Sequence, residues 1–130
     1  MGAAERAHGL KMKVVAYDPF LSPERAVDLG VEKVELPELL KRADFITLHT
    51  PLTDKTRNIL DAKALAATKK GVRIINCARG GLVDEAALIR ALREGWIAGA
   101  GFDVITAEPP PASHPMVAQE LLALPNFLLT

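Results

Sequence analysis

One arginine set among small residues is the side chain best suited to chemistry in this chain. Arg79 lies in the run Asn76-Cys77-Ala78-Arg79-Gly80-Gly81, at the end of a largely apolar segment. A guanidinium is a planar, always charged fork that pairs with a carboxylate through two hydrogen bonds. Two consecutive glycines allow the backbone to approach a ligand or to adopt positive φ. The motif therefore favours a carboxylate site, although an arginine taken alone more often caps a helix or forms an ion pair.

Acidic side chains follow two other segments that read as strands. Asp18 ends the first of these segments and precedes Pro19, whereas Asp103 ends a later one and Glu108 lies in the loop beyond it. The carboxyl ends of parallel strands meet at one edge of a sheet, where α/β folds bind their ligands, so we expect Arg79 and Glu108 at the ends of neighbouring strands. In dinucleotide folds an acid placed like Asp18 accepts hydrogen bonds from ribose hydroxyls. Alternatively, its carboxylate caps local N–H groups in an Asp-Pro turn.

A third polar run, His49-Thr50-Pro51-Leu52-Thr53, follows another predicted strand. Pro51 ends that strand, and Thr53 or Asp54 can cap the turn that follows. A lone histidine in an apolar strand does not make a site, so we interpret His49 as structural. Cys77 has no histidine partner after its motif, and we interpret it as a site-lining residue rather than a nucleophile. No metal site is predicted.

Composition excludes several classes of protein. The chain has 130 residues, with 16 basic and 16 acidic side chains and a formal net charge of zero. This balance gives no support for binding to nucleic acid or to an anionic membrane surface. No apolar run approaches the roughly 20 residues that cross a bilayer. The first six residues contain no apolar signal core, and one cysteine excludes an intramolecular disulfide. We expect one cytoplasmic domain over residues 1–130.

Helical and strand patterns alternate along the chain, which favours an α/β fold. Ser22 is placed to cap a helix with Pro23 in its first turn, and Gly30 to end it. Residues 72–77 show almost no polar alternation, which predicts a strand covered on both faces. The expected helices span 3–10, 23–30, 37–43, 61–71, 84–94 and 116–123, and the expected strands span 13–17, 31–34, 45–49, 72–77, 97–104 and 126–130.

Residues 74–85, followed by Gly101-Phe102-Asp103-Val104 and Glu108-Pro109-Pro110, closely resemble the cofactor-binding domain of the D-2-hydroxyacid dehydrogenases. Phosphoglycerate dehydrogenase and glycerate/hydroxypyruvate reductase are notable among the members that the chain resembles. Tyr17-Asp18-Pro19 matches the same family. The resemblance covers essentially the whole chain, but only the middle of a family member. It implies a Rossmann-like doubly wound sheet, NAD as cofactor, and hydride transfer between nicotinamide and a 2-hydroxy or 2-keto acid.

The resemblance also implies roles for single residues. Arg79 falls at the substrate-binding and catalytic arginine, and Glu108 at the glutamate that orients the catalytic histidine. The charge of Asp18 repels a 2′-phosphate, which implies NAD rather than NADP. The cofactor contacts that it implies are Asp18, Pro19, Thr50, Pro51, Thr56, Asn76, Cys77, Ala78 and Asp103.

The sequence departs from the family pattern at two motifs and in its length. It has no Gly-x-Gly-x-x-Gly turn, because Gly2 and Gly9 do not have that spacing. The Pro-His pair of the family would follow Thr130, and neither His8 nor His114 matches its histidine. The substrate domain of the family has no counterpart either. We therefore expect a truncated domain with weak or absent NAD binding, which does not turn over 2-hydroxy acids by itself.

A missing strand also bears on topology. In the family the strand order is 3-2-1-4-5-6, and this chain has no counterpart of strand 1. If the gap closes, the strands follow the flavodoxin-like order second-first-third-fourth-fifth, which right-handed crossovers permit. Otherwise a second chain fills the gap. We expect closure in a monomer or a simple homodimer that associates through an apolar surface. The alternative function is a non-catalytic, flavodoxin-like scaffold without ligand.

Overall fold

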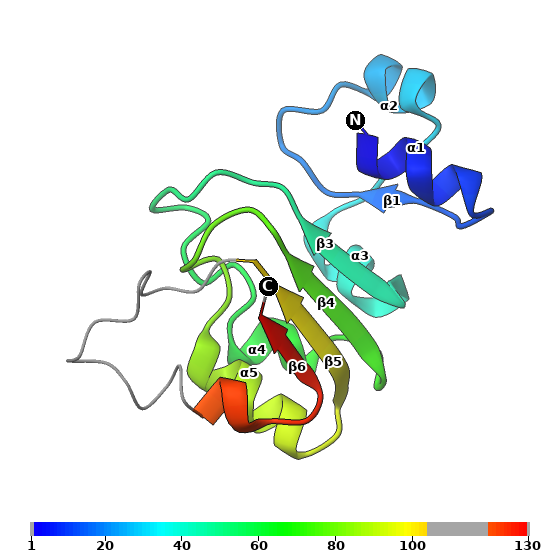
Figure 1. The fold of residues 1–130 in the computed structure, drawn as a ribbon. Helices are drawn as coiled ribbons and strands as arrows, with labels where there is room; N and C mark the ends of the chain where they lie inside the picture. The colour runs from blue at the N-terminus through cyan, green and yellow to red at the C-terminus, as the bar shows by residue number, and fades with distance from the viewer. Residues whose placement is uncertain (1, 104–119, 130) are drawn as a thin grey trace. The chain divides into compact units, whose positions relative to one another are not determined.

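The computed structural model describes residues 2–103 and 120–129. The chain divides into two compact units, Met1–Arg42 and Ala43–Thr130. Both are built from parallel strands and helices that alternate along the sequence, as the patterns predicted (Figure 1). The α/β class is therefore confirmed.

The first unit is small and contains one pair of strands. Its core consists of Ala4, Leu21, Ala26 and Val31, with three partly buried apolar residues packed against them. Val15 pairs with Glu32 in a parallel ladder. The elements are α1 (Gly2–Gly9), β1 (Val15–Ala16), α2 (Pro23–Leu29), β2 (Glu32–Lys33) and α3 (Leu36–Arg42).

Helix α2 begins and ends where the sequence predicts. The side chain of Ser22 accepts a hydrogen bond from the backbone N–H of Arg25, and Pro23 occupies the first helical turn. Gly30 follows the helix at φ 70°, in the left-handed region that glycine adopts without steric cost. The Ser22 cap ends the loop that leads from β1 into α2, and Asp18 lies in that loop.

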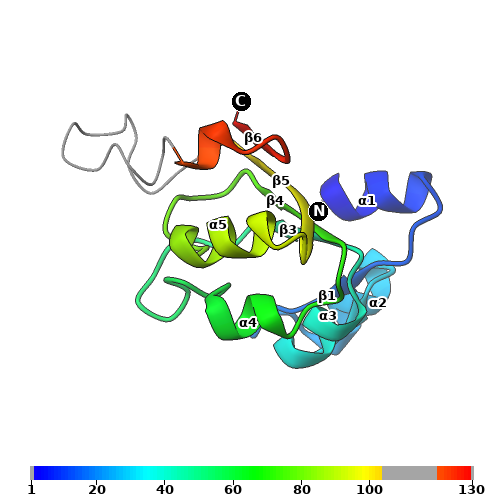
Figure 2. The ribbon, with the colours of Figure 1, turned by 90° about the horizontal axis from the view of Figure 1, so that it is seen from below.

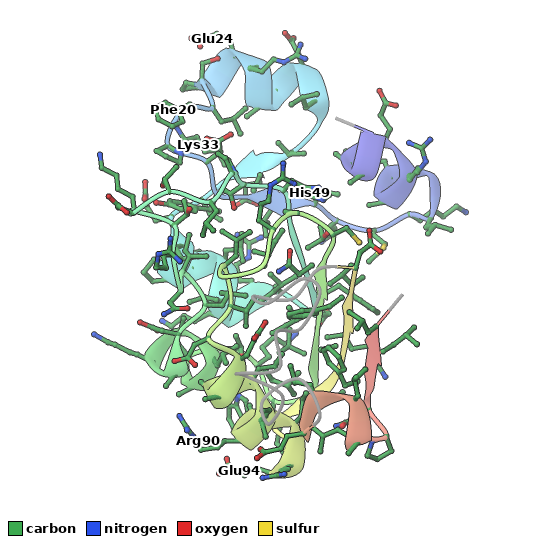
Figure 3. All side chains as sticks on the ribbon, turned by 60° about the vertical axis from the view of Figure 1, so that its left-hand side comes forward. Phe20, Glu24, Lys33, His49, Arg90 and Glu94 are labelled. Atoms are coloured by element: carbon green, nitrogen blue, oxygen red, sulfur yellow. The ribbon has the colours of Figure 1, made fainter. Side chains whose placement is uncertain are left out.

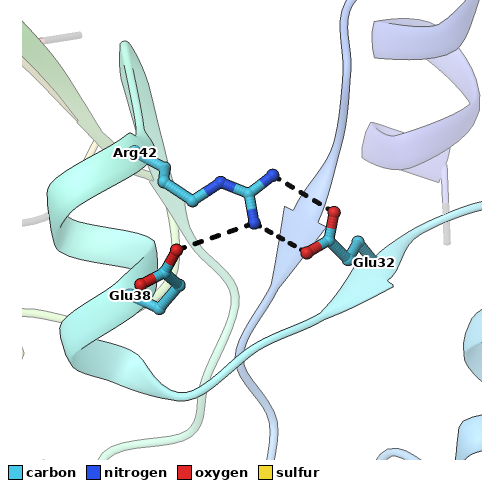
Figure 4. A network of polar contacts seen from close by, with 3 residues as sticks. All are labelled: Glu32, Glu38 and Arg42. Carbon is cyan, nitrogen blue, oxygen red and sulfur yellow. Dashed lines mark hydrogen bonds and ion pairs between the residues drawn. The ribbon is translucent and has the colours of Figure 1, made fainter.

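An exposed ion pair joins β2 to α3 (Figure 4). The Nη1 and Nη2 atoms of Arg42 lie 2.6 and 3.1 Å from the two carboxylate oxygens of Glu32. Glu38, one helical turn before Arg42, is 4.0 Å away. Hydrogen bonds from Arg42, and then its charge, hold the pKa of Glu32 below its usual value, and the same pair raises the pKa of Arg42.

The second unit contains a four-stranded parallel sheet in the order β3-β4-β5-β6. Helices α4 and α5 lie beside one another (Figure 2), and α5 packs on β5. Residues 120–123 are also helical. The elements are β3 (Phe45–Leu48), α4 (Ala62–Ala66), β4 (Val72–Asn76), α5 (Glu85–Arg93), β5 (Ile97–Phe102) and β6 (Phe127–Leu129).

Strand β4 differs from its prediction, because burial alternates along it. Val72, Ile74 and Asn76 are buried, whereas Arg73 and Ile75 are exposed. The neighbouring strands continue this open face with Phe45, which is 48% exposed, and Leu128, which is 63% exposed. The prediction that both faces of β4 are covered is therefore wrong for the part of the chain described. The apolar side chains of this sheet face are not enclosed by α4 and α5.

The predicted closure into one sheet is not formed. The strands make two sheets, β1-β2 and β3-β4-β5-β6, and no ladder pairs β1 with β3 among the described residues. Within each sheet the expected neighbours are retained, and β6 extends the sheet beside β5. Each sheet lies within one of the two units, with β1 and β2 in the first and β3 to β6 in the second. In the Rossmann order the strands that match β1 and β3 are second neighbours with one strand between them, so the family fold does not pair these two strands directly.

Helix α4 is shorter than predicted and ends at Ala66 instead of near Gly71. The hydroxyl of Thr68 donates a hydrogen bond to the carbonyl of Leu65, at 2.7 Å, and so competes with continuation of the helix. Gly71 then takes φ 92° and leads the backbone into β4.

Candidate functional site

The carboxyl ends of the strands of the second unit are aligned. Leu48 on β3 pairs with Asn76 on β4, and Asn76 pairs with Phe102 on β5. The residues that follow these positions therefore leave the sheet at one edge, as predicted. This edge carries seven residues proposed from sequence as cofactor contacts, together with the arginine: Thr50, Pro51, Thr56, Asn76, Cys77, Ala78, Arg79 and Asp103.

The turn after β4 is organised around Asn76, whose residue surface is only 1% exposed. Its Nδ2 donates to the carbonyl of Arg79, at 2.9 Å, and its Oδ1 accepts from the N–H of Ala78, at 3.0 Å. The side chain of Arg79 is exposed, and its Nη1 donates to the carbonyl of Ala78. The turn thus presents a guanidinium to solvent from a backbone held by a buried amide.

Gly81 completes this turn at φ 91°, so one of the two glycines has the positive φ that the sequence predicts. A Cβ atom there would lie 3.3 Å from a methyl group of Leu52. Glycine is required at this position both by the backbone conformation and by the close approach of the neighbouring loop.

The loop after β3 is attached to the same turn by backbone hydrogen bonds. The N–H of Asn58 donates to the carbonyl of Gly81, at 2.8 Å, and the N–H of Leu60 donates to that of Leu82. The N–H of Asp84 returns a bond to the carbonyl of Leu60, which is almost completely buried. The loops after β3 and β4 therefore form one connected structure at the edge of the sheet.

The hydroxyl groups of this loop differ in their partners. Thr56 Oγ1 donates to the carbonyl of Pro51, at 2.7 Å, and accepts from the N–H of Thr53. Thr50 Oγ1 is buried and has no hydrogen-bond partner within the described residues. A buried hydroxyl without a partner is uncommon in proteins and calls for an explanation, such as a group that binds there. Sequence reasoning identified Thr50, but this orphan hydroxyl depends on packing that no sequence motif signals.

The remaining side chains of the edge have separate environments. The N–H of Asp103 donates to the carbonyl of Asn76, at 3.0 Å, and so ties the end of β5 to that of β4. Cys77 is an exposed free thiol. His49 (Figure 3) is exposed, and its ring Nε2 lies 3.0 Å from the hydroxyl of Thr47.

Asp18 and Pro19 lie in the first unit. The Oδ1 atom of Asp18 accepts from the N–H of Phe20, at 2.9 Å, and its carbonyl accepts from the N–H of Leu21. The local turn considered for the Asp-Pro pair is therefore present. Phe20 itself is exposed (Figure 3). Glu108 lies outside the described residues.

No group of three or more His, Cys, Asp and Glu side chains among the described residues is arranged to hold a metal ion. None of the helices in the described ranges is both long and apolar enough to cross a membrane.

Known proteins match this chain along its whole length. The family model of the D-isomer specific 2-hydroxyacid dehydrogenase NAD binding domain matches residues 1–130. D-3-phosphoglycerate dehydrogenase of Bacillus subtilis is 51% identical over 118 residues, which are 88% of this chain and 22% of that protein. The human enzyme of the same name is 50% identical over 107 residues, 82% of this chain and 20% of that protein. The chain thus spans about one fifth of the length of these relatives.

Solved structures show the same similarity. A D-lactate dehydrogenase of Treponema pallidum matches with a TM-score of 0.90 and 33% identity, over 98% of this chain and 40% of that one. D-lactate dehydrogenase with NAD+ from Lactobacillus jensenii matches with a TM-score of 0.89 and 37% identity, over 99% of this chain and 41% of that one. The chain therefore belongs to the NAD-binding domain family of the D-isomer specific 2-hydroxyacid dehydrogenases.

Proposed function

We propose that this chain supplies the NAD-binding and carboxylate-binding edge of a dehydrogenase that acts on a small 2-hydroxy acid. The observation that carries the proposal is the exposed guanidinium of Arg79, held at the carboxyl ends of the strands by the Asn76 turn. A guanidinium in this place pairs with a substrate carboxylate through two hydrogen bonds. The names of the relatives, D-3-phosphoglycerate and D-lactate dehydrogenase, support this class of substrate.

The residues at this edge suit a dinucleotide. The buried, unpartnered hydroxyl of Thr50 offers a hydrogen bond that no described group takes. We propose that Thr50 and Pro51, with the loop that Thr56 shapes, hold the adenosine half. Within the first unit, the family resemblance supports Asp18 and Pro19 as residues that bind ribose hydroxyls. Asn76, Cys77 and Ala78 border the nicotinamide half, and Asp103 holds its carboxamide. When bound, NAD supplies the hydride acceptor of the reaction.

The roles left to the protein are binding, orientation and proton transfer. Arg79 binds and orients the carboxylate so that the carbon beside it faces nicotinamide, which raises the effective concentration of the reactants. Glu108 would orient a histidine that acts as general acid and base, a contribution typically worth about 10²–10⁴-fold. No histidine of this sequence matches that base. We therefore propose that residues 1–130 bind NAD weakly and do not catalyse turnover by themselves.

A calorimetric titration of the chain with NAD tests the cofactor site. We expect weak, saturable binding that falls several-fold in Thr50→Val, which removes the orphan hydroxyl at nearly constant volume. Thr47→Val is the matched control, because Thr47 lies on β3, three residues before Thr50, and its side chain is exposed. Binding that is equal in both variants, or absent from the native chain, would contradict the site and leave the ligand-free scaffold as the better account.

A second assay tests catalysis directly. The chain is mixed with NADH and hydroxypyruvate, and the absorbance of the reduced cofactor is followed. We expect no oxidation above the rate without protein. Oxidation that depends on the chain and disappears in Arg79→Ala would show that the chain is a complete catalyst.

We also propose a cytoplasmic location and at most a homodimer. The single cysteine, Cys77, suits a reducing compartment. The exposed apolar side chains on the open face of β3, β4 and β6 suit non-covalent self-association. Neither the charge balance nor the composition favours nucleic acid or membrane as a partner.

A further inference from the structure

We propose that Asn76 is the positioning residue of Arg79, fixing the direction in which the guanidinium leaves the sheet. The inference rests on the proposed function of Arg79 and adds a residue that acts through it. Asn76 was expected from sequence among the cofactor contacts. Its amide, however, is directed into the turn and not toward a ligand, because both of its polar atoms bond to the backbone of the next three residues.

The chemistry of the turn selects asparagine at this position. One amide group must donate to the carbonyl of Arg79 and at the same time accept from the N–H of Ala78. Aspartate has no donor for the carbonyl, and leucine has neither group. Serine can accept from an N–H two residues on, as in an ST turn, but it offers no second atom to reach the carbonyl of Arg79. Asparagine alone among residues of this size satisfies both bonds.

Burial gives these bonds their effect. Asn76 is 1% exposed, so water does not compete for its amide, and an unmade bond there leaves a buried polar group unsatisfied. The backbone on both sides of the Cα atom of Arg79 is thereby tied: the N–H of Ala78 before it, and its own carbonyl after it. The loop after β3 ties the turn again at Gly81. The arginine therefore starts from a fixed backbone, which lowers the entropic cost of ordering it on a ligand.

The same bonds constrain what the turn can offer a cofactor. The N–H of Ala78 is occupied by Asn76 Oδ1, so a ligand can touch Ala78 only through its methyl group or carbonyl. One Nη atom of Arg79 bonds to the carbonyl of Ala78. A guanidinium carries five N–H donors, so this bond leaves donors for a carboxylate and also orients the group.

The experiment must distinguish a role of Asn76 in positioning Arg79 from a purely structural role in stabilising the fold. Thr68 is the matched control, because it is also buried, at 4% exposure, and also makes two hydrogen bonds. Its hydroxyl donates to the carbonyl of Leu65 and accepts from the indole of Trp96. It precedes β4, whereas Asn76 ends that strand. Thr68→Val and the Asn76 variants should therefore all lower the free energy of unfolding, but only the Asn76 variants should change the conformation of the turn that carries Arg79.

The experiment uses the 130-residue chain with three substitutions: Asn76→Leu, Asn76→Ser and Thr68→Val. Amide hydrogen exchange, followed by NMR, measures how often the hydrogen bonds of the turn open, and it needs no ligand. We expect the N–H of Ala78 to exchange at least about tenfold faster in Asn76→Leu, because local opening no longer breaks a bond there. In Thr68→Val it should keep the native rate after correction for global stability. If Asn76→Leu does not fold, Asn76→Ser should keep most protection at Ala78 and shift the Arg79 Nε–Hε resonance.

Binding of oxamate, a carboxylate probe, is then followed through the same Arg79 resonance in the presence of NADH. We expect affinity to fall several-fold in Asn76→Ser and to stay native in Thr68→Val. Native exchange at Ala78 in a folded Asn76→Leu, or an unmoved Arg79 resonance in Asn76→Ser, would overturn the positioning role. Loss of exchange protection with no oxamate binding to the native chain would uphold that role and instead contradict the proposed carboxylate site. The two failures are therefore distinguishable.

Discussion

At the scale of single residues, the hydroxyl of Thr50 lowers the stability of the fold and also lies at the candidate site. It is buried and makes no hydrogen bond within the described residues. Groups of this kind are destabilising, yet they are retained where a ligand supplies the missing partner. Removal of the hydroxyl should therefore change stability and binding in opposite directions.

We expect Thr50→Val to raise the free energy of unfolding by about 1 kcal/mol, because the desolvated hydroxyl is replaced by a methyl group. Urea denaturation of the native chain and the variant, both without NAD, measures the change. The same variant should bind NAD more weakly in the titration described above. A loss of stability in Thr50→Val would mean that the hydroxyl has a partner after all.

Substitution of two glycines by alanine can distinguish the free-energy cost of a left-handed backbone from the cost of a steric clash. Gly71 and Gly81 have nearly equal φ values of 92° and 91°. An added Cβ atom at Gly71 meets nothing within 4 Å, whereas at Gly81 it meets Leu52 at 3.3 Å. Each glycine-to-alanine change should cost about 1–2 kcal/mol for the left-handed conformation. Gly81→Ala should cost more in urea denaturation, and equal losses would show that the loop after β3 yields freely.

At the scale of elements, the boundaries that follow from local chemistry were predicted well. Helix α2 begins at its Ser22 cap and ends at Gly30 because both signals act within one turn of backbone. Helix α4 ends earlier than predicted because the hydroxyl of Thr68 bonds to the carbonyl of Leu65 and competes with the backbone hydrogen bonds of the helix. The helical pattern in the sequence does not indicate this bond. The exposure of Ile75 was not predicted for a different reason. A run of apolar residues indicates that a strand can be buried on both faces, but it does not show whether other elements cover both faces.

The ion pair between β2 and α3 gives a prediction about pH. Arg42 lowers the pKa of Glu32, so any stability from the pair is present above the unfolded pKa of a glutamate and is lost as pH falls through the lower, folded value. Both side chains are exposed, so we expect only a small effect, weakened further by salt.

Glu32→Gln should therefore lower the melting temperature slightly at pH 7, and by less or not at all at a pH below the folded value. Thermal melts followed by circular dichroism at both pH values provide the measurement. Glu38→Gln is the control, because that carboxylate lies 4.0 Å from Arg42 and should have a smaller effect. An equal loss at both pH values would assign the effect of Glu32→Gln to something other than the ion pair.

At the scale of the whole molecule, the candidate site depends on how the strands are aligned with one another, and the sequence of one strand does not determine that alignment. The family resemblance identified Arg79 and its neighbours, but the hydrogen bonds between the loops after β3 and β4 depend on segments some 20 residues apart, as in the bond from Asn58 to Gly81. Strand order is equally non-local. The expected pairing of β1 with β3 is not formed among the described residues, because a strand's partner depends on segments far apart in the sequence that a local pattern does not encode.

The division into two units predicts that unfolding is not a single transition. The first unit has a small core around Ala26 and Val31, and no strand ladder joins its sheet to the other among the described residues. Small cores bury too little apolar surface for much stability. The chain has one tyrosine and one tryptophan, and these fall in different units: Tyr17 in the first and Trp96 in the second.

We therefore expect two midpoints in urea, with the tyrosine signal changing at a lower concentration than the tryptophan signal. Loss of coincidence between probes is the accepted sign that two-state behaviour fails. Val31→Ala, in the first core, should move only the tyrosine transition, and Leu88→Ala, in the buried face of α5, should move the tryptophan transition by about 2–5 kcal/mol in the free energy of unfolding. Coincident transitions that shift together in both variants would show one cooperative domain, as the sequence alone suggested, with the two sheets stabilising each other through side chains and not through strand pairing.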